Sequence, residues 1–327
     1  MDLKSRRQFL KKMRNLGVGA IGLHVVGCAD PASTANPQNQ SIPAAQATTT
    51  ADSYNFCVNL PPNEFQKLQS QQKLVITTNG IPDHRVGIFP NLDCPCAIRA
   101  IAKTYQVDLN PQVSAQATAL NGWLFGVAVN GVVFDPTGPF WSNTPGNVWQ
   151  FEVMSATAIP YLGIDCSSAH VQPSGEYHYH GLPHALISKL EHNNAASRMI
   201  LLGFAADGFP IYAPMTFDNP MNSQSQIRMV RSSYQLKTGQ RPSGGPKGFY
   251  DGSFVQDYEY VQNLGDLDEC NGRFGVTPEY PNGIYHYYIT SLFPFIPRYY
   301  RGAPDVSFKH GLPGPDAVPP ALRNIGK

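Results

Sequence analysis

Tyrosine and histidine alternate in the segment GEYHYHG, residues 175–181, with a glutamate in front of them. On an extended strand, side chains two positions apart share one face, so Glu176, His178 and His180 are predicted to lie together. Same-face residues are about 6.5–7 Å apart along the backbone, which allows two imidazoles to lean onto one ion. The pattern therefore predicts two ligands for a metal such as zinc, copper, manganese or iron.

The same residues allow other interpretations. Glu176 is suited to be a third ligand, a partner for an imidazole N–H, or a general base beside a metal-bound water. Two histidines on a strand also occur as purely structural residues, or as an acid/base pair without a metal. Tyr177 and Tyr179 take the opposite face, where we expect them to pack into the core.

An imperfect echo of this pattern, NGIYHYYIT, occupies residues 282–290. His286 takes the place of His178, whereas Tyr288 stands where His180 would be. Two such copies are expected to form neighbouring strands with their histidine faces turned together. His286 is therefore a further candidate ligand, and Tyr288 is either a phenolate ligand, a hydrogen-bond donor or a lost ligand.

Further histidines extend the candidate set. His170 lies upstream in AHVQPSGEYHYH, His184 follows His180 by four residues, and His84 comes from the turn sequence NGIPDH, where loops often carry functional groups. Imidazole ligation favours copper or zinc as the ion. Three histidines in the signal or in polar or Gly/Pro-rich contexts are interpreted as uninvolved: His24, His192 and His310.

Residues 1–28 read as an export signal rather than as part of the fold. Ser5–Lys11, SRRQFLK, resembles a twin-arginine signal, and the apolar run after it is too short to span a bilayer permanently. The run ends in VVGC, which looks like a bacterial lipobox with Cys28 as the acylated residue. We therefore expect a lipoprotein of the bacterial envelope, periplasmic or on the outer face, held to the membrane through Cys28.

Residues 29–52 are rich in Ala, Pro, Ser, Thr, Gln and Asn, a composition that cannot bury a core and that predicts a flexible tether. The folded domain is then 53–327, large enough for one substantial core. Without the six basic residues and the single acid of the signal, 18 basic and 22 acidic residues remain, a net charge of about −4. A mildly acidic domain gives no electrostatic basis for binding nucleic acid.

With Cys28 lipidated, five of the six cysteines remain in an oxidising compartment, so at least one of them is expected to be unpaired within the chain. Cys166 and Cys270 precede the two tyrosine–histidine segments at similar places, which predicts a bridge between them. Cys57 is then expected to pair with Cys94 or Cys96, although the CPC sequence is also compatible with a soft-metal site.

Turn signals of the Asn-Gly and Asp-Gly type recur along the chain, which also holds 29 glycines and 29 prolines. Segments 123–136 and 199–214 each read as two apolar strands around such a turn. Further predicted elements are strands at 73–80 and 148–154 and helices at 63–72 and 184–193. This pattern predicts a single all-β domain with few short helices, built as an antiparallel β-sandwich or irregular barrel.

The chain resembles the YHYH family of exported bacterial proteins, which is named for the tetrapeptide at 177–180. The resemblance covers most of residues 75–305. It rests on these blocks: TTNGIPDH (77–84), FGVAVNGVVFDP (125–136), VWQFE (148–152), GEYHYHGLP (175–183), LLGFAADGFPIYAP (201–214), LDECNGRFG (267–275) and GIYHYYIT (283–290). The resemblance implies no specific activity. It implies a metal or polar site, which maps here to His84, His170, His178, His180 and His286.

Three functions follow as hypotheses. The first is a lipid-anchored domain that binds copper or zinc through His178 and His180. The second is a metal-dependent hydrolase or oxidoreductase with Glu176 as base. The third is a surface module that binds a glycan or protein through exposed tyrosines of residues 294–302, and an aromatic groove far from the histidines would favour it.

Overall fold

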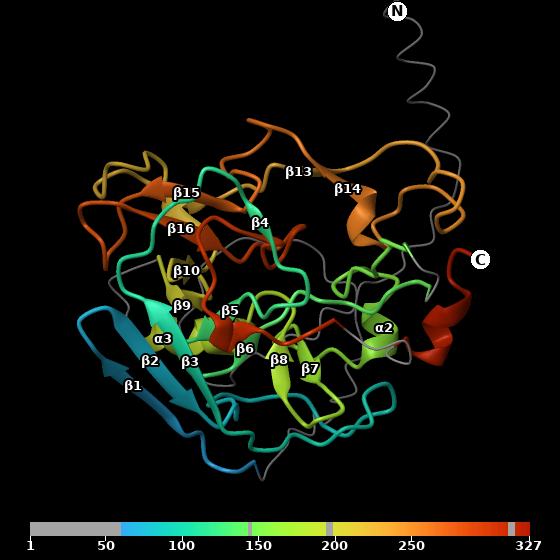
Figure 1. The fold of residues 1–327 in the computed structure, drawn as a ribbon, viewed down its shortest axis with the longest axis horizontal. Coiled ribbons are helices and arrows are strands. Elements are labelled where there is room, and N and C mark those ends of the chain that lie inside the picture. Colours follow the sequence, from blue (N-terminus) through green and yellow to red (C-terminus); the bar gives the residue numbers. More distant parts are fainter. Residues whose placement is uncertain (1–59, 143–145, 194–198, 313–317) are drawn as a thin grey trace, which may run out of the picture.

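The computed structural model describes residues 60–142, 146–193, 199–312 and 318–327. The predicted signal, the tether and Cys28 lie outside these residues. The described part is mostly β-structure with a few short helices (Figure 1), and the predicted all-β class is confirmed. The elements are β1 (Phe65–Gln69), β2 (Lys73–Thr78), β3 (Lys103–Asp108), β4 (Thr118–Ala119), β5 (Gly126–Ala128), β6 (Val133–Phe134), α2 (Ile159–Leu162), β7 (Ala169–Val171), β8 (Tyr177–Tyr179), α3 (His184–Asn193), β9 (Leu201–Ala205), β10 (Pro210–Tyr212), β11 (Met215–Phe217), β12 (Ile227–Met229), β13 (Tyr234–Leu236), η1 (Val255–Asp257), β14 (Tyr258–Tyr260), β15 (Gly272–Gly275), β16 (Ile284–Tyr288), β17 (Tyr299–Tyr300), η2 (Val306–Phe308) and η4 (Pro320–Asn324).

A curled sheet of eight strands forms the centre of the molecule, in the order β15-β16-β10-β9-β5-β6-β8-β7. Figure 1 shows β7 and β15 at opposite ends of it. The sheet is mixed rather than purely antiparallel, because β6 pairs with β8 and β10 pairs with β16 in parallel. Smaller antiparallel sheets surround it, including the three-stranded sheet β1-β2-β3. No helix among the described residues is long and apolar enough to cross a membrane.

Both predicted hairpins are present, as β5–β6 and as β9–β10, and the helix at 184–193 is confirmed as α3. The predicted helix at 63–72 is wrong, because Phe65–Gln69 pairs residue by residue with β2. Its straight-chain polar residues have helical propensity, but hydrogen bonding to a neighbouring strand overrides this local preference. Segment 148–154 forms only isolated bridges, at Gln150 and Phe151.

An approximate two-fold repeat relates the two halves of the central sheet. The hairpin sequences GVAVNGVVF (126–134) and GFAADGFPI (203–211) align without a gap. Where β5 meets β9, Gly126 opposes Ala205 and Ala128 opposes Gly203, so equivalent residues exchange places across the contact. The repeat axis therefore passes between Val127 and Phe204, which oppose each other.

The tyrosine–histidine strands follow the same repeat. In one half, β8 lies parallel to the second hairpin strand β6 and antiparallel to the edge strand β7. In the other half, β16 has the same relation to β10 and β15. Four strands separate β8 from β16 in the sheet. The expectation that the two copies are neighbouring strands is therefore wrong, because each copy completes its own half.

The glycines at the repeat axis are required by close backbone approach. A Cβ at Gly126 would lie 2.4 Å from the carbonyl oxygen of Phe204, and one at Gly203 would lie 2.2 Å from that of Val127. We expect Gly126→Ala or Gly203→Ala to lower the free energy of unfolding by about 3 kcal/mol or more. Denaturant titration measures this, with Gly244→Ala as control. Gly244 has open space around it and a positive φ, so only the backbone strain of about 1 kcal/mol is expected there. Equal losses in all three variants would contradict the close-approach argument.

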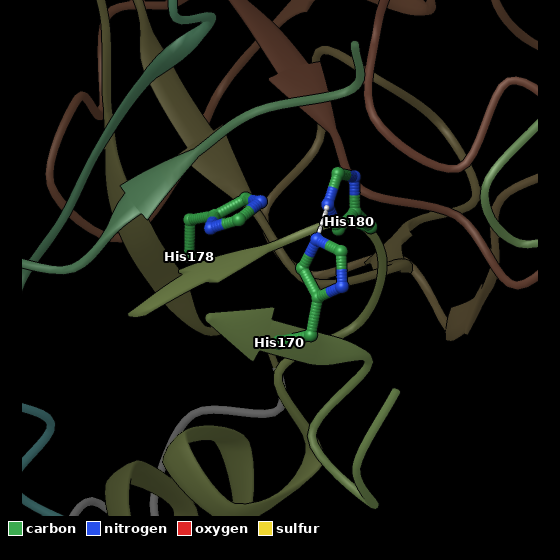
Figure 2. Close-up of side chains that lie close together, drawn as sticks. All are labelled: His170, His178 and His180. Atoms are coloured by element: carbon green, nitrogen blue, oxygen red, sulfur yellow. Dashed lines mark hydrogen bonds between the residues drawn. The ribbon is translucent and has the colours of Figure 1, made fainter. Parts of the chain in front are cut away.

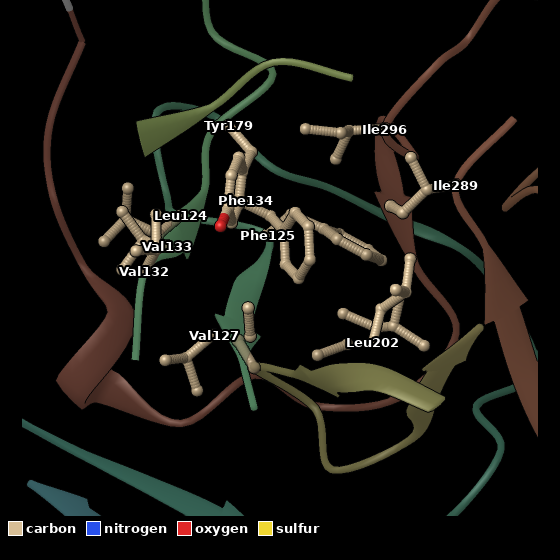
Figure 3. Packing of buried hydrophobic residues seen from close by; sticks show 14 of the residues in the cluster. Leu124, Phe125, Val127, Val132, Val133, Phe134, Tyr179, Leu202, Ile289 and Ile296 are labelled. Carbon is tan, nitrogen blue, oxygen red and sulfur yellow. The ribbon is translucent and has the colours of Figure 1, made fainter. Parts of the chain in front are cut away.

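The main apolar core covers the sheet face that carries Tyr179. Figure 3 shows this ring packed among aliphatic and aromatic side chains from both halves. Tyr177 and Tyr179 are both buried, as predicted from the alternation. The opposite face of β8 is thereby left to the histidines.

The predicted bridge between Cys166 and Cys270 is wrong, because Cys270 is a free, buried thiol. Cys166 precedes β7 and Cys270 precedes β15, which are the two edges of the central sheet. A disulfide needs Cα atoms about 4.4–6.8 Å apart, far less than the span of eight strands. Cys94 and Cys96 are also free, so neither pairs with Cys57.

Candidate metal centre

Three histidines converge where β7 and β8 meet (Figure 2). The antiparallel register places His170 directly opposite His178. His180 follows β8, two residues after His178 and on the same face, and its backbone N–H donates to the carbonyl of Ser168 at 2.7 Å. The strand geometry thus fixes all three side chains on one face at the edge of the sheet.

The three rings are close enough to share one ion. One ligand nitrogen from each histidine lies within 4.8 Å of the others. The Nε2 atoms of His170 and His180 are 3.1 Å apart, and the ring centroids of His178 and His180 are 4.5 Å apart. Two nitrogens on a tetrahedral zinc are separated by about 3.3 Å, since each Zn–N bond is about 2.0–2.1 Å. The set needs only small side-chain rotations to reach this geometry.

Backbone carbonyls fix the tautomers of two rings. His170 donates through Nδ1 to the carbonyl of Leu162, at the end of α2, at 2.8 Å. His178 donates through Nδ1 to the carbonyl of Glu176 at 3.2 Å. A carbonyl can only accept, so Nδ1 carries the proton in both rings and each Nε2 keeps its lone pair. Such second contacts are typical of metal-ligating histidines.

The third ring carries an unsatisfied nitrogen. Because His170 Nε2 is an acceptor, the 3.1 Å contact requires His180 to donate through its own Nε2. The Nδ1 atom of His180 is then buried without a hydrogen bond of normal geometry to the described residues, although the backbone of Asp135 interacts with the ring and raises its pKa. A cation that displaced the Nε2 proton would also convert this Nδ1 into a donor. The three histidines therefore leave one ring nitrogen poorly satisfied by hydrogen bonds, whereas a bound cation could be coordinated by all three rings.

Burial keeps all three imidazoles neutral. It lowers the pKa of His170 to about 3, with a further contribution from the neighbouring His178, whose own pKa burial lowers to about 4. Burial and the two neighbouring rings hold the pKa of His180 well below its ordinary value. At neutral pH the three rings therefore need to lose no net proton to bind an ion, because the Nε2 proton of His180 can move to its Nδ1.

The sequence model of the YHYH protein family matches residues 104–302, which is more than half of the chain. This chain belongs to the YHYH family. No curated protein and no solved structure matches it. The family resemblance seen in the sequence is thereby confirmed, although its first block, at 77–84, precedes the matched residues. The YHYH tetrapeptide itself supplies two of the three converging histidines.

Glu176 lies just before this tetrapeptide, is buried and is not one of the three converging side chains. Its carbonyl oxygen orients His178, while its carboxylate makes no hydrogen bond to the described residues. Burial raises the pKa of this carboxyl, opposed by the charges of Lys103 and His310. Glu176 is therefore close to His178 in the sequence, and its raised pKa makes its carboxylate a better proton acceptor than an ordinary glutamate.

The two more distant candidate ligands are placed elsewhere. His84 contacts the opposite face of the YHYH strand, where its Nε2 lies 2.5 Å from the hydroxyl of Tyr179 and its ring stacks on that phenol. His286 belongs to the other half of the sheet and is fully buried, with Nε2 2.7 Å from the hydroxyl of Tyr288. His184 begins α3 and is likewise absent from the triad.

Two residues outside the predicted ligand set act on the triad: Asp135, which the sequence did not single out, and His310, which was interpreted as uninvolved. Asp135 follows β6, its N–H donates to the carbonyl of Tyr179 at 2.9 Å, and its buried carboxylate accepts from the N–H of Thr137 at 2.9 Å. Its charge raises the pKa of His170. His310 is exposed, yet its charge affects both Asp135 and His178. Only the position of Asp135 at the end of a predicted hairpin strand signalled that it could reach the site.

Proposed function

We propose that this YHYH protein binds a transition metal ion through His170, His178 and His180. The observation that carries the proposal is the convergence of three neutral imidazoles with ligand nitrogens within 4.8 Å of one another. Imidazole nitrogen suits zinc and copper in particular, and we favour these two ions. The ion would supply Lewis-acid chemistry, or redox chemistry in the case of copper, at a site that the protein backbone has prearranged.

We further propose that the protein acts outside the cytoplasm as a lipoprotein. The twin-arginine segment at residues 5–11 and the lipobox before Cys28 support export and membrane anchoring. Twin-arginine export moves folded proteins, which is compatible with loading an ion before export. Radiolabelled palmitate incorporation in the wild type but not in Cys28→Ala would test the anchor.

Metal content of the protein purified from its native host tests the central proposal. We expect about one zinc or copper per chain by elemental analysis, and loss of that metal in the double variant His178→Ala/His180→Ala. His84→Ala is the matched control, because it removes an imidazole that contacts the same strand from the other face. Sub-stoichiometric metal in the wild type, or equal metal in the double variant, would overturn the proposal.

A metal-dependent hydrolase is a second candidate. Three protein ligands leave one position open on a tetrahedral ion, which is the arrangement of catalytic rather than structural zinc sites. Glu176 would serve as the proton acceptor in this case, and its carboxylate is not engaged by the described residues. Glu176→Gln is expected to abolish hydrolysis of an activated ester while leaving the metal content unchanged, and loss of both together would assign Glu176 to ion binding instead.

A further inference from the structure

A cavity of about 520 Å³ lies at the other edge of the central sheet, against β15 and β16. Its lining includes Tyr260, Asn263, Asp268, Phe274, Tyr285 and Arg301. The histidine triad belongs to the opposite edge, on β7 and β8. This cavity is therefore separate from the proposed metal centre, and its volume is within the range of small-molecule sites.

A rigid carboxylate forms one wall of the cavity. Asp268 Oδ1 accepts from the backbone N–H of Cys270 at 3.0 Å and of Gly272 at 3.1 Å. The hydroxyl of Tyr285 lies 3.0 Å from both carboxylate oxygens. Three donors fix the orientation of Asp268, while its Oδ2 keeps capacity to accept a further hydrogen bond from a ligand.

The other walls mix donors with apolar surface. Arg301 is half-buried, and among the described residues its guanidinium has only a long contact of 3.4 Å to Glu269, so most of its donors are available to a ligand. Asn263 adds an amide with both a donor and an acceptor. Phe274 leaves 54% of its surface exposed, so its ring is accessible to a ligand in the cavity.

The repeat of the sheet shows that this opening is specific to one half. The pair of Tyr285 and Asp268 has an equivalent in the other half, the pair of Tyr177 and Asp165, in which the Tyr177 hydroxyl donates to Asp165 Oδ2 at 2.8 Å. There, the backbone N–H of Gly87 also donates to Asp165 at 3.0 Å, and the ring of Phe89 packs against Tyr177 at 6.1 Å. The pair of Asp165 and Tyr177 is thus covered by the loop that contains Gly87 and Phe89, whereas the pair of Asp268 and Tyr285 faces a cavity.

We propose that this cavity binds a neutral sugar. An aromatic ring such as Phe274 packs against the apolar C–H face of a pyranose, and the planar groups of Asp268, Asn263 and Arg301 pair with its hydroxyls. The carboxylate of Asp268 disfavours an anionic ligand, and the charged side chains of Asp268 and Arg301 disfavour an apolar ligand. Of the segment 294–302, expected from the sequence to bind through its tyrosines, only Arg301 lines the cavity.

Isothermal titration calorimetry with maltose, cellobiose and diacetylchitobiose tests the proposal. We expect saturable binding of at least one disaccharide, weakened tenfold or more in Phe274→Ala and in Arg301→Gln. Phe249→Ala is the matched control, because Phe249 is also exposed but does not line the cavity. Circular dichroism establishes that each variant is folded. The proposal would be overturned if none of the three sugars bound saturably at millimolar concentrations. It would also be overturned if folded Phe274→Ala and Arg301→Gln bound sugar as tightly as the wild type.

The same titrations in His178→Ala/His180→Ala separate this proposal from that for the metal. Sugar binding is expected to persist there within twofold, because the cavity and the triad occupy opposite edges of the sheet. A hexasaccharide of the preferred sugar that binds more tightly than the disaccharide identifies a polysaccharide chain as the ligand. Equal affinity identifies a free small sugar.

Discussion

Metal affinity of the folded protein is expected to stay nearly constant between pH 7.5 and pH 5. The free imidazoles of His170 and His178 have pKa values of about 3 and about 4, and that of His180 is well below its ordinary value. Protons therefore do not compete for the ligand nitrogens in this range. For three histidines of ordinary pKa near 6.5, competition at pH 5 would weaken binding by roughly 10⁴-fold.

The chain provides its own control for this prediction. A synthetic peptide of residues 169–181 carries the same three histidines without the fold, so its imidazoles should titrate normally. Zinc affinities of protein and peptide, measured by competition with a chromophoric chelator, are expected to diverge as the pH falls from 7 to 5. A parallel decline in both, while circular dichroism shows the protein still folded, would contradict the burial argument.

Local periodicity was sufficient to predict two of the three histidines of this centre. The period of two placed His178 and His180 on one face and the tyrosines in the core, because these relations involve only neighbouring residues. The hairpins at Asn130-Gly131 and Asp207-Gly208 were predictable for the same reason, since turn chemistry acts over a few residues.

Long-range pairing decided the rest. His170 was a candidate by proximity in sequence, but only the register of β7 against β8 places it opposite His178. The same kind of information separates His286 from the centre, because nothing near it in sequence reveals that four strands lie between β8 and β16. The predicted bridge of Cys166 to Cys270 failed for that reason as well.

The sequence shows the tyrosine–histidine echo, but the structure is needed to match the residues that precede it. Matching Cys166 with Cys270 in the sequence would make Glu269 the counterpart of Asp165. In the structure, Asp268 is the counterpart of Asp165, because each accepts a tyrosine hydroxyl and the N–H two residues later. Loops of different length between carboxylate and tyrosine conceal this correspondence.

The second half of the sheet contains a counterpart of the triad in which a side chain supplies the positive charge. Arg273 opposes His286 as His170 opposes His178, and Tyr288 stands in the place of His180. The Arg273 guanidinium donates to Thr216 Oγ1 at 2.5 Å, and its charge lowers the pKa of His286 further than burial alone. The guanidinium of Arg273 thus places a positive charge beside His286, at the position where His170 lies beside His178 in the other half.

Arg273→His together with Tyr288→His is therefore expected to create a second metal site. The strand register already places both positions beside His286, so no change of backbone is required. In the background His178→Ala/His180→Ala, zinc titration should rise from none to about one ion per chain, with a Kd in the micromolar range or below. Arg273→Gln/Tyr288→Phe is the control, because it removes the same guanidinium and hydroxyl without adding imidazoles. A folded Arg273→His/Tyr288→His protein that binds no more zinc than this control would show that pairing register alone does not define the centre.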